Sequence, residues 1–121
     1  MKLADLERSM GINMTKFDET YEFLKGMYSD GYFPDFLVDK IKTELEKVVV
    51  FLETGVTDVE QIQEKFDAMT IAINDLQEEF EENDSEIETA ARDCIATDVI
   101  EILNWFEIDI DVEDALGERD W

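Results

Sequence analysis

The stretch from Val59 to Phe80, VEQIQEKFDAMTIAINDLQEEF, decides the fold. Its apolar residues recur at alternating steps of three and four, which is the heptad pattern of a helix that packs against another helix at a shallow angle. The sequence therefore predicts a long bundle helix here. The seam consists of Val59, Ile62, Phe66, Met69, Ile73, Leu76 and Phe80.

Capping residues mark the start of this helix and of the next one. Thr57 and Glu60 have the spacing of a capping box, and so do Ser85 and Glu88. The second box predicts another long helix after the break at Asn83. Its apolar stripe consists of Ile87, Ala91, Ile95, Val99, Ile102 and Phe106.

Two further helices are predicted toward the N-terminus. Pro34 suits the first turn of one of them, and Gly55 follows its end. The other is predicted from Lys16 to Tyr28, where apolar residues again follow helical spacing. The stripe of the first is Leu37, Ile41, Leu45, Val48 and Leu52, widened by Val49, Val50 and Phe51; that of the second is Phe17, Tyr21, Leu24 and Tyr28.

Together these segments predict an all-α fold, an up-and-down antiparallel bundle of four main helices with short terminal helical segments. Short links between long helices make neighbouring helices antiparallel. Residues 1–15 are interpreted as a weakly patterned N-terminal extension, and residues 16–121 as a single helical bundle domain. The chain length of 121 residues is common for one domain.

The charge balance excludes several classes of partner. The chain has 10 basic and 33 acidic residues, a net charge of −23, and residues 54–121 alone carry −19. Such a field repels nucleic acid phosphates and anionic lipids, so we expect neither nucleic acid nor membrane binding. A single cysteine and the lack of a signal sequence or a long apolar run predict a cytoplasmic protein.

The acids are densest between Glu78 and Glu88, across the corner between two predicted helices. One interpretation is a docking surface for a basic protein partner, or a surface that mimics nucleic acid phosphate. The other is a solvated corner, which is the commoner origin of charge runs. The candidate partner-binding residues are Glu78, Glu79, Glu81, Glu82, Asp84 and Glu86.

Catalytic and metal chemistry find little support in the sequence. The chain has no histidine, the commonest metal ligand and general base. The run Asp109, Asp111, Glu113 resembles the start of a calcium loop, but Asp114 stands where that loop requires glycine. Cys94 is interpreted as a small buried core residue. No catalytic residue, metal site or cofactor is therefore predicted.

Aromatic residues suggest two more roles. The terminal Trp121 is predicted to anchor the tail onto the bundle. The segment with Tyr28, Tyr32, Phe33 and Phe36 is interpreted as a hydrophobic plug at the bundle end, while a recognition surface stays open as the alternative.

Two stretches and the C-terminus carry a resemblance. They read MYSDGYFPDFLVDK at residues 27–40, NDLQEEFEENDSEIETAARD at residues 74–93, and ERDW at residues 118–121. Over roughly residues 22–121 the chain resembles a family of small acidic bacterial proteins catalogued only as a domain of unknown function. The resemblance implies a bacterial cytoplasmic protein, supplies no catalytic motif, and leaves residues 1–15 as an untypical extension.

Three hypotheses of function follow. The leading one is a non-enzymatic protein-binding module, an immunity-type or regulatory protein that covers a basic partner. The alternative is a small-molecule-binding or enzymatic bundle that uses carboxylates in an interhelical pocket, which requires a carboxylate on the core side of a helix. The third is a homo-oligomer that pairs the heptad seam between chains, although like charge opposes self-association.

Overall fold

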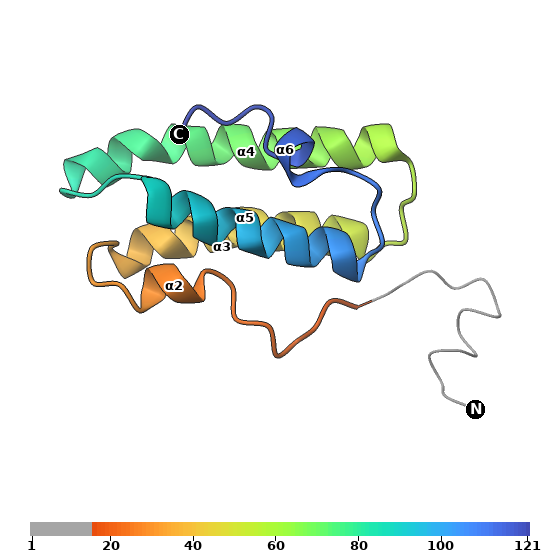
Figure 1. The fold of residues 1–121 in the computed structure, drawn as a ribbon, viewed down its shortest axis with the longest axis horizontal. Coiled ribbons are helices and arrows are strands. Elements are labelled where there is room, and N and C mark those ends of the chain that lie inside the picture. The colour runs from red at the N-terminus through yellow and green to blue at the C-terminus, as the bar shows by residue number, and fades with distance from the viewer. Residues whose placement is uncertain (1–15) are drawn as a thin grey trace.

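The structure is a computed structural model that describes residues 16–121 (Figure 1). Within these residues it contains helices and no strand, so the predicted all-α class is confirmed. The N-terminal extension, residues 1–15, lies outside the described residues. The helices are α2 (Lys25–Tyr28), α3 (Asp35–Leu52), α4 (Val59–Glu82), α5 (Thr89–Trp105) and α6 (Val112–Ala115).

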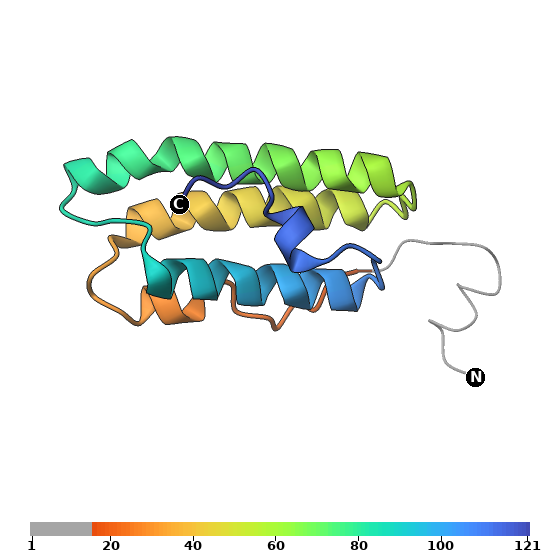
Figure 2. The same cartoon turned by 45° about the horizontal axis from the view of Figure 1, so that its top comes forward.

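The three long helices form the core. They run side by side, with α4 and α5 each antiparallel to the helix before it in the chain (Figures 1 and 2). The stripes of α3 and α5 are buried as predicted, except that Phe51 and Phe106 are only partly buried and Val50 faces outward. In the α4 seam, Val59 is exposed and Leu76 is half-buried, while the other five residues are buried.

The predicted helix from Lys16 to Tyr28 is wrong except for its last turn. Only Lys25–Tyr28 is helical, and residues 16–24, here called the arm, follow a non-helical course along the bundle (Figure 1). Leu24 ends the arm in the left-handed conformation, with φ 55°. Three long helices are therefore present in residues 16–121, and a bundle of four main helices is not confirmed.

The arm lacks helical hydrogen bonds, and contacts between aromatic rings fix its position instead. The Phe17 ring centroid lies 5.5 Å from those of Tyr21, Phe23 and Trp105. The indole N–H of Trp105 also donates to the Lys16 carbonyl at 2.9 Å. The apolar spacing that predicted a helix thus reflects contacts with the end of α5.

Both predicted capping boxes are displaced. Asp58 rather than Thr57 caps α4, because its carboxylate accepts the N–H groups of Glu60 and Gln61. Helix α5 begins at Thr89, and Ser85 lies buried in the link before it without a hydrogen-bond partner for its hydroxyl in the described part of the chain. The link turns at Asp84, whose φ is 57°.

The C-terminal segment, residues 112–121, begins with α6 and then lies against α4; we call it the strap (Figure 2). Amide side chains of α4 hold its backbone. Asn74 donates to the Glu118 carbonyl at 2.8 Å and accepts the Asp120 N–H at 3.1 Å. The half-buried Trp121 packs against the core, which confirms its predicted role as an anchor.

Candidate functional site

The acidic corner is defined as the six predicted partner-binding residues. The last turns of α4 carry four of them, and the α4–α5 link carries the other two. Five are exposed, whereas Glu79 is half-buried and forms an ion pair with Lys40 of α3 at 2.6 Å. Among residues 16–121 this is the only ion pair of the corner, so most of its charge is uncompensated. Its members are Glu78, Glu79, Glu81, Glu82, Asp84 and Glu86.

Two exposed aromatic side chains lie at the same end of the molecule. The α2–α3 link and the acidic corner both lie at this end (Figure 1, left), and the Lys40–Glu79 pair lies one helical turn from Phe36. Tyr32 and Phe36, here called the aromatic pair, are 43% and 49% exposed. The predicted plug is therefore correct for Phe33 alone, which is buried, while Tyr28 is half-buried.

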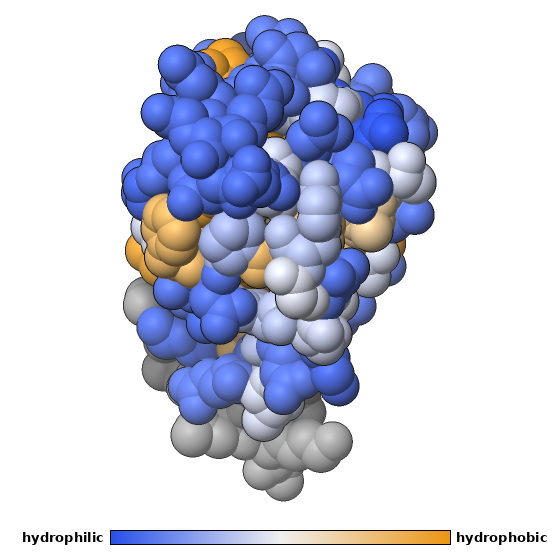
Figure 3. Space-filling model, turned by 90° about the vertical axis from the view of Figure 1, so that its left-hand side faces the viewer, coloured by the Kyte–Doolittle hydropathy of each residue, from blue (hydrophilic) through white to orange (hydrophobic). Residues whose placement is uncertain are grey.

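Figure 3 looks onto this end of the molecule. Hydrophilic residues cover most of the upper part, and separate hydrophobic areas appear below them. Protein-binding surfaces often combine a charged rim with a few aromatic side chains. The arrangement at this end therefore has both elements of such a surface.

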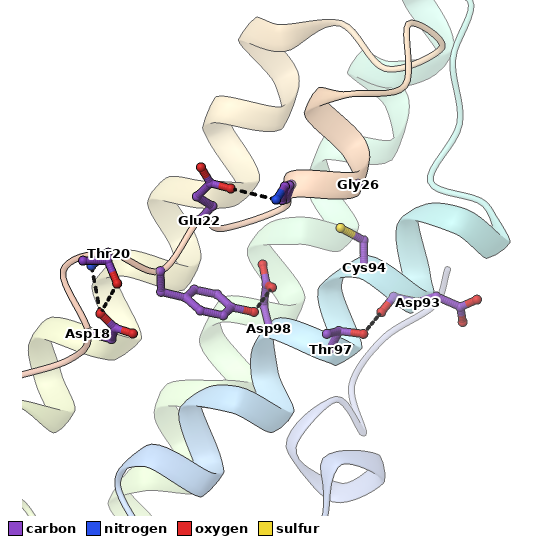
Figure 4. Close-up of a pocket in the computed structure, with 10 residues that line it drawn as sticks. Asp18, Thr20, Glu22, Gly26, Asp93, Cys94, Thr97 and Asp98 are labelled. Carbon is purple, nitrogen blue, oxygen red and sulfur yellow. Dashed lines mark hydrogen bonds and ion pairs between the residues drawn. The ribbon is translucent and has the colours of Figure 1, made fainter.

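A second candidate site is a pocket between the arm and α5, with a volume of about 560 Å³ (Figure 4). Asp18, Glu22, Asp93 and Asp98 contribute carboxylates to its wall. Lys25 is its one basic residue and pairs with Glu22 at 3.3 Å. The lining would favour a cationic ligand on charge alone.

Asp98 is the buried carboxylate of this pocket, only 3% exposed. One of its oxygens accepts the Tyr21 hydroxyl at 2.5 Å, and the other accepts the Leu24 N–H at 2.7 Å. Burial raises the pKa of Asp98, and the two hydrogen bonds oppose that rise. Burial, followed by the bond to Asp98, also raises the pKa of Tyr21, which keeps its hydroxyl protonated as a donor.

Asp98 therefore has a structural explanation. Its two oxygens hold the arm and the left-handed turn at Leu24, and both are occupied by protein donors. Sequence reasoning missed this residue, although a signal existed. Asp98 follows Ile95 by three residues and directly precedes Val99, so it falls within the apolar stripe, where an unpartnered carboxylate would be costly.

Cys94 was predicted to be a small buried core residue; it packs against the core but is only half-buried, because it also lies in the wall of the pocket. Its sulfur points toward α2 (Figure 4), and a methyl group at Gly26 would lie 3.5 Å from it. Burial raises the pKa of the Cys94 thiol. The thiolate, which is the nucleophilic form, is therefore disfavoured.

Metal-binding groups do not gather in the described chain: no three cysteine or carboxylate side chains of residues 16–121 are placed to share an ion. Asp111, part of the run that resembles a calcium loop, instead caps α6 through the Glu113 N–H. None of the described helices is both long enough and apolar enough to cross a lipid bilayer.

Residues 16–121 thus have an all-α structure with an acidic, partly aromatic end and a carboxylate-lined pocket. The model of a family described as "Family of unknown function (DUF5713)" matches residues 17–121, and the chain belongs to that family. The predicted resemblance to a family of unknown function is therefore confirmed. No curated protein and no solved structure matches the chain.

Proposed function

We propose that this protein is a non-enzymatic binding module whose acidic corner and aromatic pair dock a basic protein. The observation that carries the proposal is their common location. Six carboxylates with one ion pair among the described residues lie at the same end as two exposed aromatic rings.

The physical roles of the two groups differ. Long-range attraction to the carboxylates raises the rate at which a basic partner arrives, and this effect weakens as salt rises. Tyr32 and Phe36 can bury apolar area and accept Lys or Arg side chains over their rings, which slows dissociation. A basic partner would also relieve the repulsion among neighbouring carboxylates of the corner.

The finer assignment is an immunity-type or regulatory protein that acts in the cytoplasm by covering its partner. The single cysteine and the strongly acidic surface support such a setting. In this proposal residues 16–121 form one domain, and the arm with α2 lies where a fourth main helix was expected.

A second candidate function is binding or conversion of a small cation in the pocket beside Asp98. Asp98 favours this second function, because it is a carboxylate on the core side of a helix, which the hypothesis requires. Both oxygens of that carboxylate are nevertheless engaged by Tyr21 and Leu24. We therefore prefer the binding module.

The test is a pull-down from native lysate with the tagged full-length chain at low and high salt, followed by purification and rebinding of the recovered protein. Glu81→Lys/Glu82→Lys reverses two exposed charges in the corner, and Glu60→Lys/Glu64→Lys makes the same change at the other end of α4. We expect a basic partner whose affinity falls at least roughly tenfold in the corner variant only.

Equal losses in the two charge-reversal variants would show that net charge alone drives binding, which would contradict a specific surface. Phe36→Ala separates the two roles. It should increase the dissociation rate and leave the salt dependence of association unchanged.

A further inference from the structure

A shallow depression of about 520 Å³ lies on the second half of α3, away from the acidic corner. Val50 and Phe51 supply its apolar surface, and Lys65 of α4 closes one side. Val50 is 62% exposed, the most exposed large hydrophobic side chain of residues 16–121. Packing within the described fold does not account for this exposure, and exposed apolar surface of this kind is typical of ligand or partner contacts.

The charge of the depression opposes that of the whole chain. Lys47 and Lys65 border it, and Glu46 is its one carboxylate. Lys47 pairs with Glu44, outside the depression, at 3.0 Å, so Lys65 is the lysine available to a ligand. The Lys65 ammonium lies 5.5 Å from the centroid of the Phe51 ring and forms no ion pair with any described residue. In a chain with 33 acids, an ammonium held over an apolar ring without a carboxylate is well placed to receive an anion from outside.

We infer that this depression binds an amphiphilic organic carboxylate. The apolar chain of the ligand covers Val50 and Phe51, and its carboxylate pairs with Lys65. The volume falls in the range of small-molecule sites, and burial of methylene groups supplies the main driving force. The polyanionic backbone of a nucleic acid would meet the field of the whole chain, whereas one carboxylate on an apolar body meets mainly the nearby Lys65.

The experiment is a titration of the full-length protein with sodium decanoate below its micelle concentration, followed by two-dimensional amide NMR. Decyltrimethylammonium, which has the same chain length and the opposite charge, is the matched ligand. We expect saturable shifts at Val50, Phe51 and Lys65 with decanoate alone. Lys65→Gln should weaken decanoate binding roughly fivefold, the loss of about one ion pair.

Lys42→Gln is the matched control, because Lys42 is on α3 but outside the depression. It should leave decanoate affinity unchanged, while Val50→Asp should abolish binding with the amide spectrum otherwise retained. The inference is overturned if decanoate does not bind, if both amphiphiles bind alike, or if Lys65→Gln has no effect. A dimer in sedimentation that Val50→Asp dissociates would also overturn it, because a second copy would then cover this face.

Discussion

The arm and the strap are both fastened to the long helices by bonds between side chains and backbone, but with different chemistry. The arm depends on the carboxylate of Asp98, which is buried and accepts two donors. The strap depends on neutral amides of α4. Asn74 both donates to and accepts from its backbone, and Gln63 donates to the Asp114 carbonyl at 2.8 Å.

The difference shows how the cost of an attachment depends on charge and burial. A buried carboxylate makes strong bonds to N–H and O–H donors, yet it loses the solvation of its charge. An amide near the surface makes weaker bonds, and water can replace each of them. The arm should therefore respond strongly to the loss of one side chain, and the strap should lose stability in small steps.

The largest expected effect comes from Asp98→Ala. The substitution leaves the Leu24 N–H and the Tyr21 hydroxyl without their acceptor, so we expect unfolding to become easier by about 3 kcal/mol. Urea unfolding followed by circular dichroism measures the change. Asp98→Asn keeps the shape: its amide oxygen can accept the Leu24 N–H and its amide nitrogen can donate to the Tyr21 hydroxyl oxygen, so it should retain most of the stability. A loss of stability below about 1 kcal/mol in Asp98→Ala would contradict the expectation that the arm is more sensitive than the strap to the loss of one side chain.

The pH dependence gives a second test of the buried charge. Because the pKa of Asp98 is raised in the folded state, folding favours its protonated form. The contribution of Asp98 to stability is fully present below its unfolded-state pKa, near 3.8. It declines as pH rises through the higher pKa of the folded state.

We therefore expect the stability of the natural chain relative to Asp98→Asn to fall as pH rises, by at most about 1.4 kcal/mol per unit. Urea unfolding of both proteins between pH 3.5 and pH 8 measures this difference, in which the other carboxylates cancel. A difference that grows with pH would mean that the two hydrogen bonds outweigh the burial of the charge.

The smallest expected effect is on the strap. Asn74→Ala removes two exposed bonds to backbone, and we expect a loss of about 1 kcal/mol because water can take their place. Asp75→Ala, at an exposed position on the same helix, serves as the control. Urea unfolding measures the loss. If Asn74→Ala lost more stability than Asp98→Ala, the strap rather than the arm would be the more sensitive attachment.

The long helices could be predicted because each carries its own burial pattern. The seam from Ile62 to Phe80 and the stripe from Ile87 to Ile102 depend on spacing within one segment, which the sequence contains in full. The acidic corner could be located for the same reason, since its residues are neighbours in the chain. Its exposure and its proximity to Phe36 depend on how the helices meet, and they required the structure.

The arm could not be predicted because its conformation is decided far away in the chain. Phe17, Tyr21 and Leu24 have helical spacing, but Asp98 takes the Leu24 N–H and the Tyr21 hydroxyl from a position 77 residues beyond Tyr21. No local pattern reports a partner at that distance. The same reasoning explains why Cys94 was predicted to be buried. Its exposure depends on the distant Gly26, which has no side chain to cover the sulfur.

The left-handed turn at Leu24 has a consequence for synthesis on the ribosome. A leucine in this conformation costs about 1–2 kcal/mol, and the bond to Asp98 offsets that cost. Of residues 16–121, the arm leaves the ribosome first, and its acceptor emerges much later, with α5. The left-handed turn therefore stays without its acceptor while α3 and α4 are made, and the part of the described chain that is made first completes its contacts only after α5 has emerged.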